Sequence, residues 1–227
     1  MLLCLVTDRR RLVPGASLQS ARRCLLDQAR HAVAAGIDVI QLRERDLDAA
    51  ALVSLGQDLL RITRGTPTRL LINDRLDVAL ACGADGVHLR GDSIPVAAAR
   101  QLAPSGFLIG CSVHSVSEAV AAAAADYLLA GTVFPTVSKA SDTATIGVDG
   151  LRAIVRAVSV PVLAIGGMTI DRGHAAAGAG ASGIAAIGLF LASEPDGRLP
   201  CRAVSLRAVA DALRHQARTG GPAGPGG

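Results

Sequence analysis

Short runs of apolar residues recur along the chain, and a longer stretch of mixed apolar and polar positions follows almost every one. The runs are rich in Val, Ile, Leu and Ala, and they have the length of strands rather than of helices. Gly-containing breaks separate them from their neighbours. We therefore predict eight strands, at Leu2–Val6, Ile37–Leu42, Arg69–Ile72, Gly86–Leu89, Phe107–Gly110, Tyr127–Ala130, Val160–Ile165 and Gly183–Ile187.

The stretches between the strands carry apolar residues at i, i+3 and i+4, which is the spacing of one helix face. They predict helices at Ala21–Ala35, Ala49–Ile62, Ile94–Leu102, Ser115–Ala124, Val148–Val158 and Ile170–Ala177, with a further helix after Arg75. Strands and helices that alternate in this way indicate a parallel sheet with right-handed crossovers.

A recurring sequence pattern marks the transition from helix to strand. Gly36, Gly83 and Gly180 each follow a helix and precede a strand, where glycine takes the left-handed conformation without steric cost. Eight repeated units in 227 residues fit a closed (β/α)8 barrel better than an open doubly wound sheet. The predicted fold class is α/β, with a single TIM-barrel domain at 1–218 and a disordered Gly/Pro-rich tail at 219–227.

Composition limits the classes of function. No apolar run reaches the ~18 residues of a membrane-spanning helix, and the first one is too short for a signal peptide, so we predict a cytoplasmic protein without a membrane partner. The five cysteines form no CxxC pair, which argues against disulfides and structural zinc. A net charge of +4 with 2% aromatic residues argues against nucleic acid as a partner. The oligomeric state, including a homo-oligomer, is left open.

Polar residues that directly follow the strands of a βα barrel meet at one face, where barrel enzymes hold their active sites. Gln41, Arg43 and Arg45 alternate at the end of the second strand, so in extended geometry they share one side and can meet an anion. The alternative is a strand end whose charges are merely solvated. The alternation of three polar residues favours a site.

Asn73 and Asp74 follow the third strand. Asp74 suits either an N-terminal helix cap or a ligand of Mg²⁺, which prefers hard oxygen donors, and its position favours the metal. After the fourth strand, Asp92 or Ser93 suits a helix cap, and Asp92 is a second, weaker candidate for the metal. His88 lies within the fourth strand, and we interpret it as a buried histidine with satisfied hydrogen bonds.

Hydroxyl groups follow the next two strands. Because the residues after Ser112 form a capping box, Ser112 is free to face a ligand; a Ser–His or Cys–His nucleophile pair is the weaker alternative. After the sixth strand, Thr136, Ser138 and Lys139 combine two hydroxyls with an ammonium group. This combination suits a diphosphate better than it suits an ordinary surface loop.

Glycines mark the ends of the last two strands, with Gly166 and Gly167 after the seventh and Ile187 and Gly188 at the eighth. Barrels often bind phosphate through main-chain amides of these two loops, because glycine permits a close approach. Two tight turns would be the alternative. The joint placement at these two strands favours a phosphate site.

Motifs in the same order as in a known superfamily extend to about Phe190. They are Thr7-Asp8-Arg9, Gln41-Leu42-Arg43-Glu44-Arg45, Asn73-Asp74-Arg75, Asp85-Gly86-Val87-His88-Leu89, Gly131-Thr132-Val133-Phe134-Pro135-Thr136-Val137-Ser138-Lys139 and Ile165-Gly166-Gly167. In these motifs the chain resembles thiamine phosphate synthase and its relative, the TenI-type thiazole tautomerase, with the synthase favoured.

Resemblance to the synthase implies a transferase of thiamine biosynthesis with Mg²⁺ as cofactor. Such an enzyme couples hydroxymethylpyrimidine diphosphate to thiazole phosphate and releases thiamine phosphate and pyrophosphate. The implied diphosphate and metal site is Gln41, Arg43, Arg45, Asn73 and Lys139, with Asp74 and Asp92 for Mg²⁺. The implied pyrimidine and thiazole phosphate site is Ser112, Thr136, Ser138, Gly166, Gly167, Ile187 and Gly188. The predicted catalytic residues are Arg43, Lys139 and Ser112.

Some positions depart from the family's pattern. The synthases place Gly-Gln-x-Asp after the fourth strand, its last residue being a second Mg²⁺ ligand, whereas Arg90-Gly91-Asp92-Ser93 puts Ser93 there. Arg45 replaces a lysine, and Thr132 stands where a tautomerase would carry histidine. Two alternatives therefore stay open: an isomerase that aromatises a thiazole carboxylate phosphate, and a non-catalytic phosphate-binding regulator.

Overall fold

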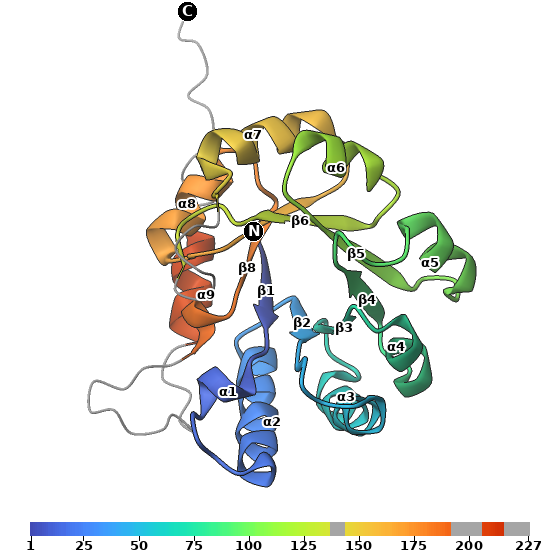
Figure 1. Cartoon of the computed structure of the whole chain (residues 1–227). Helices are drawn as coiled ribbons and strands as arrows, with labels where there is room; N and C mark the ends of the chain where they lie inside the picture. The colour runs from blue at the N-terminus through green and yellow to red at the C-terminus, as the bar shows by residue number, and fades with distance from the viewer. Residues whose placement is uncertain (137–143, 192–205, 216–227) are drawn as a thin grey trace, which may run out of the picture.

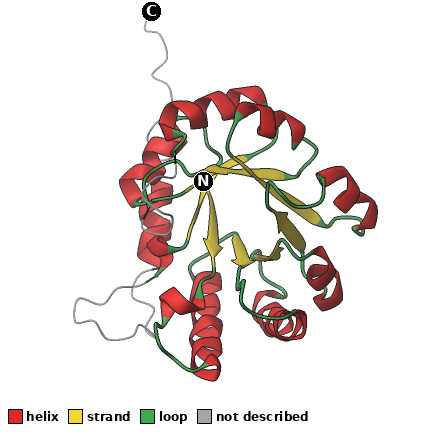
Figure 2. Ribbon diagram, viewed as in Figure 1, coloured by secondary structure: helices red, strands yellow, loops and turns green. Residues whose placement is uncertain are grey.

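The computed structural model describes residues 1–136, 144–191 and 206–215. Within them, eight parallel strands form a closed barrel in sequence order, and β1 pairs with β8 to complete it. Helices surround the strands, as Figures 1 and 2 show. The predicted (β/α)8 TIM barrel is confirmed, whereas the predicted tail at 219–227 lies outside the described residues.

The strands are β1 Leu2–Val6, β2 Val39–Leu42, β3 Arg69–Asn73, β4 Gly86–Leu89, β5 Leu108–Val113, β6 Tyr127–Gly131, β7 Val162–Ile165 and β8 Gly183–Ala186. Each matches a predicted strand. The largest difference is in β5, which runs on to Val113 instead of ending at Gly110. Ser112 pairs with Leu129 of β6, so it belongs to the strand, and the prediction that it follows the strand is wrong. A polar side chain is tolerated there because the barrel interior supplies a hydrogen-bond partner.

The helices are α1 Arg9–Leu12, α2 Leu18–Ala34, α3 Ala49–Thr63, α4 Leu76–Cys82, α5 Val96–Leu102, α6 Val116–Ala121, α7 Gly147–Ala157, α8 Ile170–Gly178 and α9 Leu206–His215, with the 3₁₀ helix η1 Gly188–Phe190. The sequence pattern did not predict α1 and η1, because a single turn is too short to show a period. It also did not predict α9, which follows the last strand and packs on α2 and α8.

Glycine ends helices where the pattern predicts it. Gly83 is the C-cap of α4 in the left-handed region, with φ 74° and ψ 36°. Its N–H donates to the last carbonyls of the helix, which satisfies groups that the helix itself leaves unpaired. The chain can therefore turn directly from α4 into β4.

Apolar side chains pack in two layers. The larger layer lies between the strands and the surrounding helices. The smaller one fills the barrel and consists of Cys4, Val6, Leu71, Tyr127, Leu129, Leu163 and Ala185. Gly110 leaves room for the Tyr127 ring, because a Cβ at Gly110 would lie 2.2 Å from it. The filled interior leaves the carboxyl ends of the strands as the place for a site.

Two expectations from composition bear on the described residues. Cys4, Cys24, Cys82 and Cys111 are buried and free, and Cys201 lies outside the described part of the chain. Burial raises the pKa of Cys4 to about 12, so its thiol stays protonated. None of the described helices has the length and apolar character needed to cross a bilayer.

Candidate active site

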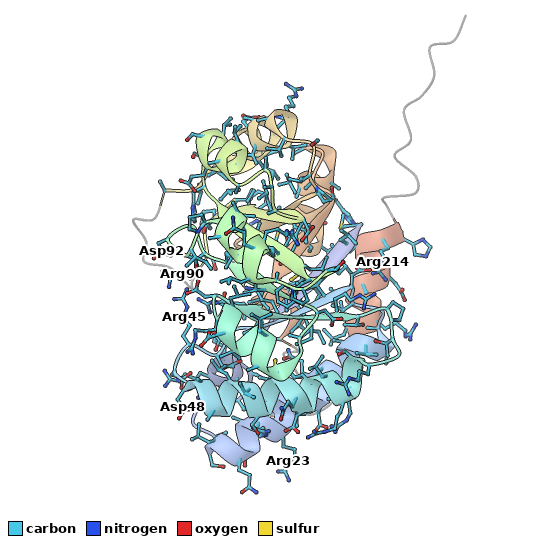
Figure 3. All side chains as sticks on the ribbon, turned by 90° about the vertical axis from the view of Figure 1, so that its right-hand side faces the viewer. Arg23, Arg45, Asp48, Arg90, Asp92 and Arg214 are labelled. Carbon is cyan, nitrogen blue, oxygen red and sulfur yellow. The ribbon has the colours of Figure 1, made fainter. Side chains whose placement is uncertain are left out.

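A cavity of about 780 Å³ opens at the carboxyl ends of the strands. Many of the predicted site residues line it: Gln41, Arg43, Arg45, Asn73, Asp92, Ser112, Thr136, Gly166, Gly167, Ile187 and Gly188. Asp74 is not among the lining residues, and Ser138 and Lys139 lie outside the described residues. Figure 3 shows Arg45 and Asp92 at one end of the molecule and Arg214 at the opposite end. The fold thus gathers residues from loops far apart in sequence.

The side chains at the end of β2 and directly after it point alternately to two sides of the chain. Gln41, Arg43 and Arg45 line the cavity, as the extended geometry predicts. Glu44 and Asp46, which alternate with the two arginines, turn the other way and contact Arg9 of α1. One short segment therefore supplies both arginines of the cavity and the carboxylates that bind Arg9.

Arg9 is the centre of a buried ion cluster, and it is 4% exposed. Its guanidinium donates to Glu44 Oε2 at 2.9 Å and to both carboxylate oxygens of Asp46 at 2.6 and 2.5 Å. The hydrogen bonds from Arg9 lower the pKa of Asp46 to about 2. The Arg43 N–H also donates to Thr7 Oγ1 at 2.9 Å. The ends of β1 and β2 are thereby joined, which restricts where Arg43 and Arg45 can point.

Positive charge accumulates at the cavity mouth. Burial, and then the charges of Arg45 and Arg90, lower the pKa of Arg43. A guanidinium stays charged despite such a shift because its ordinary pKa is so high. Like charges held together are unfavourable unless an anion binds between them. The electrostatics therefore indicate an anion-binding site.

Gln41 leaves one buried acceptor without a partner. The side chain lies in the cavity wall and is 2% exposed, and its Nε2 donates to Asn73 Oδ1 at 2.9 Å. Its Oε1 is buried and has no hydrogen-bond partner among the described residues. Buried polar atoms rarely lack partners, so this oxygen indicates a ligand that donates a hydrogen bond.

Asp74 has an unusual backbone conformation, with φ 65°, at the start of the loop after β3. Its Oδ1 accepts a hydrogen bond from Ser93 Oγ, and its Oδ2 lies 3.7 Å from Arg90 Nη1. It does not cap α4, whose N-cap is Arg75 without a side-chain bond. The next helix likewise begins without a side-chain cap, so the capping alternatives for Asp92 and Ser93 are wrong.

The donor set at this position tests whether a metal fits. Asp92 Oδ2 accepts from Arg90 Nη2 at 2.6 Å, so the carboxylates of Asp74 and Asp92 both face one guanidinium. Ser93 provides a neutral hydroxyl where the family pattern has a carboxylate. No group of three or more His, Cys, Asp or Glu with metal-binding geometry occurs among the described residues. These residues do not fit a two-carboxylate Mg²⁺ site.

His88 connects the cavity to the barrel interior. It is 1% exposed, its Nε2 lies 2.8 Å from Ser112 Oγ, and its Nδ1 lies 3.0 Å from the Tyr127 hydroxyl. Burial lowers the pKa of His88 to about 3, so the imidazole is neutral near pH 7. The interpretation of His88 as a buried, satisfied histidine is confirmed. It also lines the cavity and holds Ser112 in place, which the sequence pattern did not show.

Acidification tests the neutral state of His88. Between its folded pKa of about 3 and its unfolded value of ~6.5, the unfolded chain binds more protons. The free energy of unfolding therefore falls as pH is lowered through this window, by up to about 1.4 kcal/mol per pH unit. Urea unfolding at several pH values should show a steeper loss for the wild type than for His88→Gln, which cannot titrate. Equal slopes for the two proteins would contradict the assignment.

Two loops approach closely on the far side of the cavity. Gly166 and Gly167, which follow β7, have φ 105° and 60°, and a Cβ on Gly167 would lie 2.4 Å from the Pro135 carbonyl oxygen. Arg172 of α8 donates to the Gly167 carbonyl at 2.7 Å, and its guanidinium lies 5.0 Å from the Phe134 ring centre. Only glycine allows this approach, so main chain rather than side chain faces the cavity here.

Several lining residues were not predicted as site residues, namely Arg11, Arg90, Glu118 and Met168, and His114 was considered only as part of the weaker nucleophile pair. Arg11 belongs to the one-turn helix α1, which the periodicity could not reveal. His114 Nδ1 lies 3.0 Å from Glu118 Oε2, and both side chains are about half exposed at the rim. Arg90 directly follows β4, so its position at a strand end was the available signal.

Comparisons with known proteins agree with this arrangement. The sequence model of the family described as thiamine monophosphate synthase matches residues 3–190. A thiamine-phosphate synthase of Methanoregula boonei is 48% identical over 74% of this chain and 78% of its own length. Another, from Methanospirillum hungatei, is 39% identical over 94% and 98% of the two chains. The solved structure of a thiamine phosphate pyrophosphorylase from Pyrococcus furiosus is 34% identical, covers 96% of both chains and has a TM-score of 0.76. The chain belongs to the thiamine monophosphate synthase family.

Proposed function

We propose that the chain is a thiamine phosphate synthase, a transferase that joins hydroxymethylpyrimidine diphosphate to thiazole phosphate. The observation that carries the proposal is the cavity lined by Arg43, Arg45 and Gln41, whose Oε1 has no hydrogen-bond partner among the described residues. The cavity combines arginines that can bind an anion with a hydrogen-bond acceptor, Gln41, for a neutral group on a ring. The names of the relatives over most of the chain support the same activity.

In this reaction the bond between the pyrimidine methylene carbon and the diphosphate oxygen breaks, and the electron pair leaves with the diphosphate. The lone pair of the thiazole nitrogen then forms the new carbon–nitrogen bond. Arg43 and Arg45 stabilise the departing negative charge, because guanidinium groups bind phosphate oxygens through paired hydrogen bonds. Lys139 stays a predicted member of this site and Ser138 of the thiazole phosphate site, and both lie outside the described residues.

The pyrimidine ring fits beside Gln41 and Ser112. Rotation of the Gln41 amide would turn Oε1, which has no partner among the described residues, toward the amino group of the ring. Ser112, held by His88, contacts the ring from β5. The thiazole phosphate then occupies the loops of Thr136, Gly166, Gly167, Ile187 and Gly188, where main-chain groups are accessible to an anion.

The test is synthesis from purified components. Protein mixed with both phosphorylated substrates and Mg²⁺ should yield thiamine phosphate and pyrophosphate in equal amounts, and omission of either substrate should abolish both products. No product at high protein concentration would end the proposal. Magnesium as a cofactor stays a prediction, and loss of product on adding EDTA would support a metal requirement. A cytoplasmic location also stays a prediction.

The second candidate is the thiazole tautomerase, and the observation that favours it is the His114–Glu118 pair at the cavity rim. A histidine paired with a carboxylate can transfer protons without a metal. Thr132, where the tautomerase would carry histidine, is buried and has no basic group. Isomerisation of a thiazole carboxylate phosphate that survives EDTA, without any coupling, would favour this candidate over the synthase.

A further inference from the structure

Arg90 lies at the cavity mouth, and the family pattern assigns it no role. Figure 3 shows it beside Arg45 and Asp92, and all three line the cavity. We propose that Arg90 binds the diphosphate of the pyrimidine substrate and makes diphosphate binding less dependent on Mg²⁺. The proposal deepens the synthase function and rests on it for the identity of the ligand.

The contacts of Arg90 leave donors for a ligand. Its Nη2 donates to Asp92 Oδ2 at 2.6 Å, and its Nη1 lies 3.7 Å from Asp74 Oδ2, beyond hydrogen-bonding distance. A guanidinium has five N–H donors in a fixed plane, so the bond to Asp92 occupies a small part of this capacity. The side chain is 42% exposed, which keeps it accessible from the cavity. Asp92 therefore acts as a positioning residue that holds Arg90 at the rim.

The charged residues that line the cavity favour an anion at this place, because the arginines Arg11, Arg43, Arg45 and Arg90 outnumber the carboxylates Asp92 and Glu118. Arg43 and Arg45 line the same cavity, and the charges of Arg45 and Arg90 both act on Arg43. A diphosphate offers several anionic oxygens, which suits guanidinium groups that approach from different loops. Arg90 extends from the loop after β4, so it adds a contact from a direction that the β2 loop does not provide.

Ser93 explains why a metal is less needed here. Its hydroxyl donates to Asp74 Oδ1, where a carboxylate would repel Asp74 and attract a cation between the two. In this chain the fixed cation near Asp74 is Arg90. Near Asp74 the chain thus carries the neutral hydroxyl of Ser93 and the positive charge of Arg90. A two-carboxylate metal site would require a second negative charge there.

The test is calorimetric titration with inorganic pyrophosphate, in EDTA and again with Mg²⁺. Wild type, Arg90→Gln and Arg75→Gln are compared. Arg75 is a matched control because it pairs with Asp77 two residues ahead, as Arg90 pairs with Asp92, yet it does not line the cavity. Thermal melting of each variant checks that it is folded.

In EDTA, Arg90→Gln should raise the dissociation constant of pyrophosphate about tenfold, as expected for the loss of one charge-assisted hydrogen bond, and Arg75→Gln should leave it unchanged. Ser93→Asp should weaken binding in EDTA and recover it with Mg²⁺. The proposal is overturned if the wild type binds no pyrophosphate in EDTA, or if the two arginine variants behave alike. Pyrophosphate binding does not depend on turnover, so a wild type that binds it through Arg90 but makes no thiamine phosphate would refute the synthase and not the binding site.

Discussion

Replacing Arg43 with Gln is expected to lower kcat/KM for thiamine phosphate formation by about 10²- to 10³-fold. This magnitude is typical of losing one preorganised group that stabilises charge developing in the transition state. Arg43 is suited to such a role because it is partly buried in the cavity, its backbone is tied to Thr7, and the surroundings contain further positive charge. The measurement is steady-state kinetics with both substrates at saturating Mg²⁺.

The matched control for Arg43 is Arg23→Gln. Arg23 is an exposed residue of α2, and Figure 3 shows it away from the end that carries Arg45 and Arg90. The control should keep wild-type kinetics. If Arg43→Gln also keeps them, while remaining folded, the cavity is not where the diphosphate leaves.

Replacing Arg9 with Met is expected to lower the free energy of unfolding by about 3–5 kcal/mol. The reason is that Glu44 and Asp46 lose their guanidinium partner, and Glu44 remains buried without it. Urea unfolding at about pH 7 measures the change. Kinetic activity of the folded fraction should fall as well, because the same cluster fixes the segment that carries Arg43.

Two comparisons sharpen the Arg9 experiment. Arg10→Met removes an exposed arginine that lies 2.8 Å from the same Asp46, and it should cost less than about 1 kcal/mol. Combining Arg9→Met with Glu44→Leu should cost less than Arg9→Met alone, because no unpaired charge then stays buried. Equal losses for Arg9→Met and Arg10→Met would show that burial of the cluster has no energetic consequence.

The features that could be predicted from the sequence are those that depend on local backbone geometry. Strand alternation after β2 depends on backbone geometry alone, so Gln41, Arg43 and Arg45 could be placed on one side in advance. The glycines before strands also predicted where helices end, because few residues other than glycine adopt the left-handed conformation without steric cost. Both signals act over a few neighbouring positions.

The contacts that sequence reasoning missed join segments far apart in the chain. The pairing of Arg9 with Glu44 spans 35 positions, and that of His88 with Ser112 spans 24. Neither pair shows a period, because each depends on which strand ends become neighbours after the barrel closes. Arg90 carries no sequence signal beyond its position directly after β4, and its neighbours Asp92 and Ser93 suit a metal site or a helix cap rather than an anion site.

The pairing of β1 with β8 has a consequence for how the protein is made. Leu2 of β1 pairs with Gly183 of β8, so β1 meets its second neighbour only after all the strands between them have been translated. At 5–20 residues per second, that interval is roughly 10 to 40 s. Throughout it, one edge of the nascent sheet is open to strands of neighbouring chains. Emergence of the eighth strand is therefore the event that ends this exposure and allows the barrel to close.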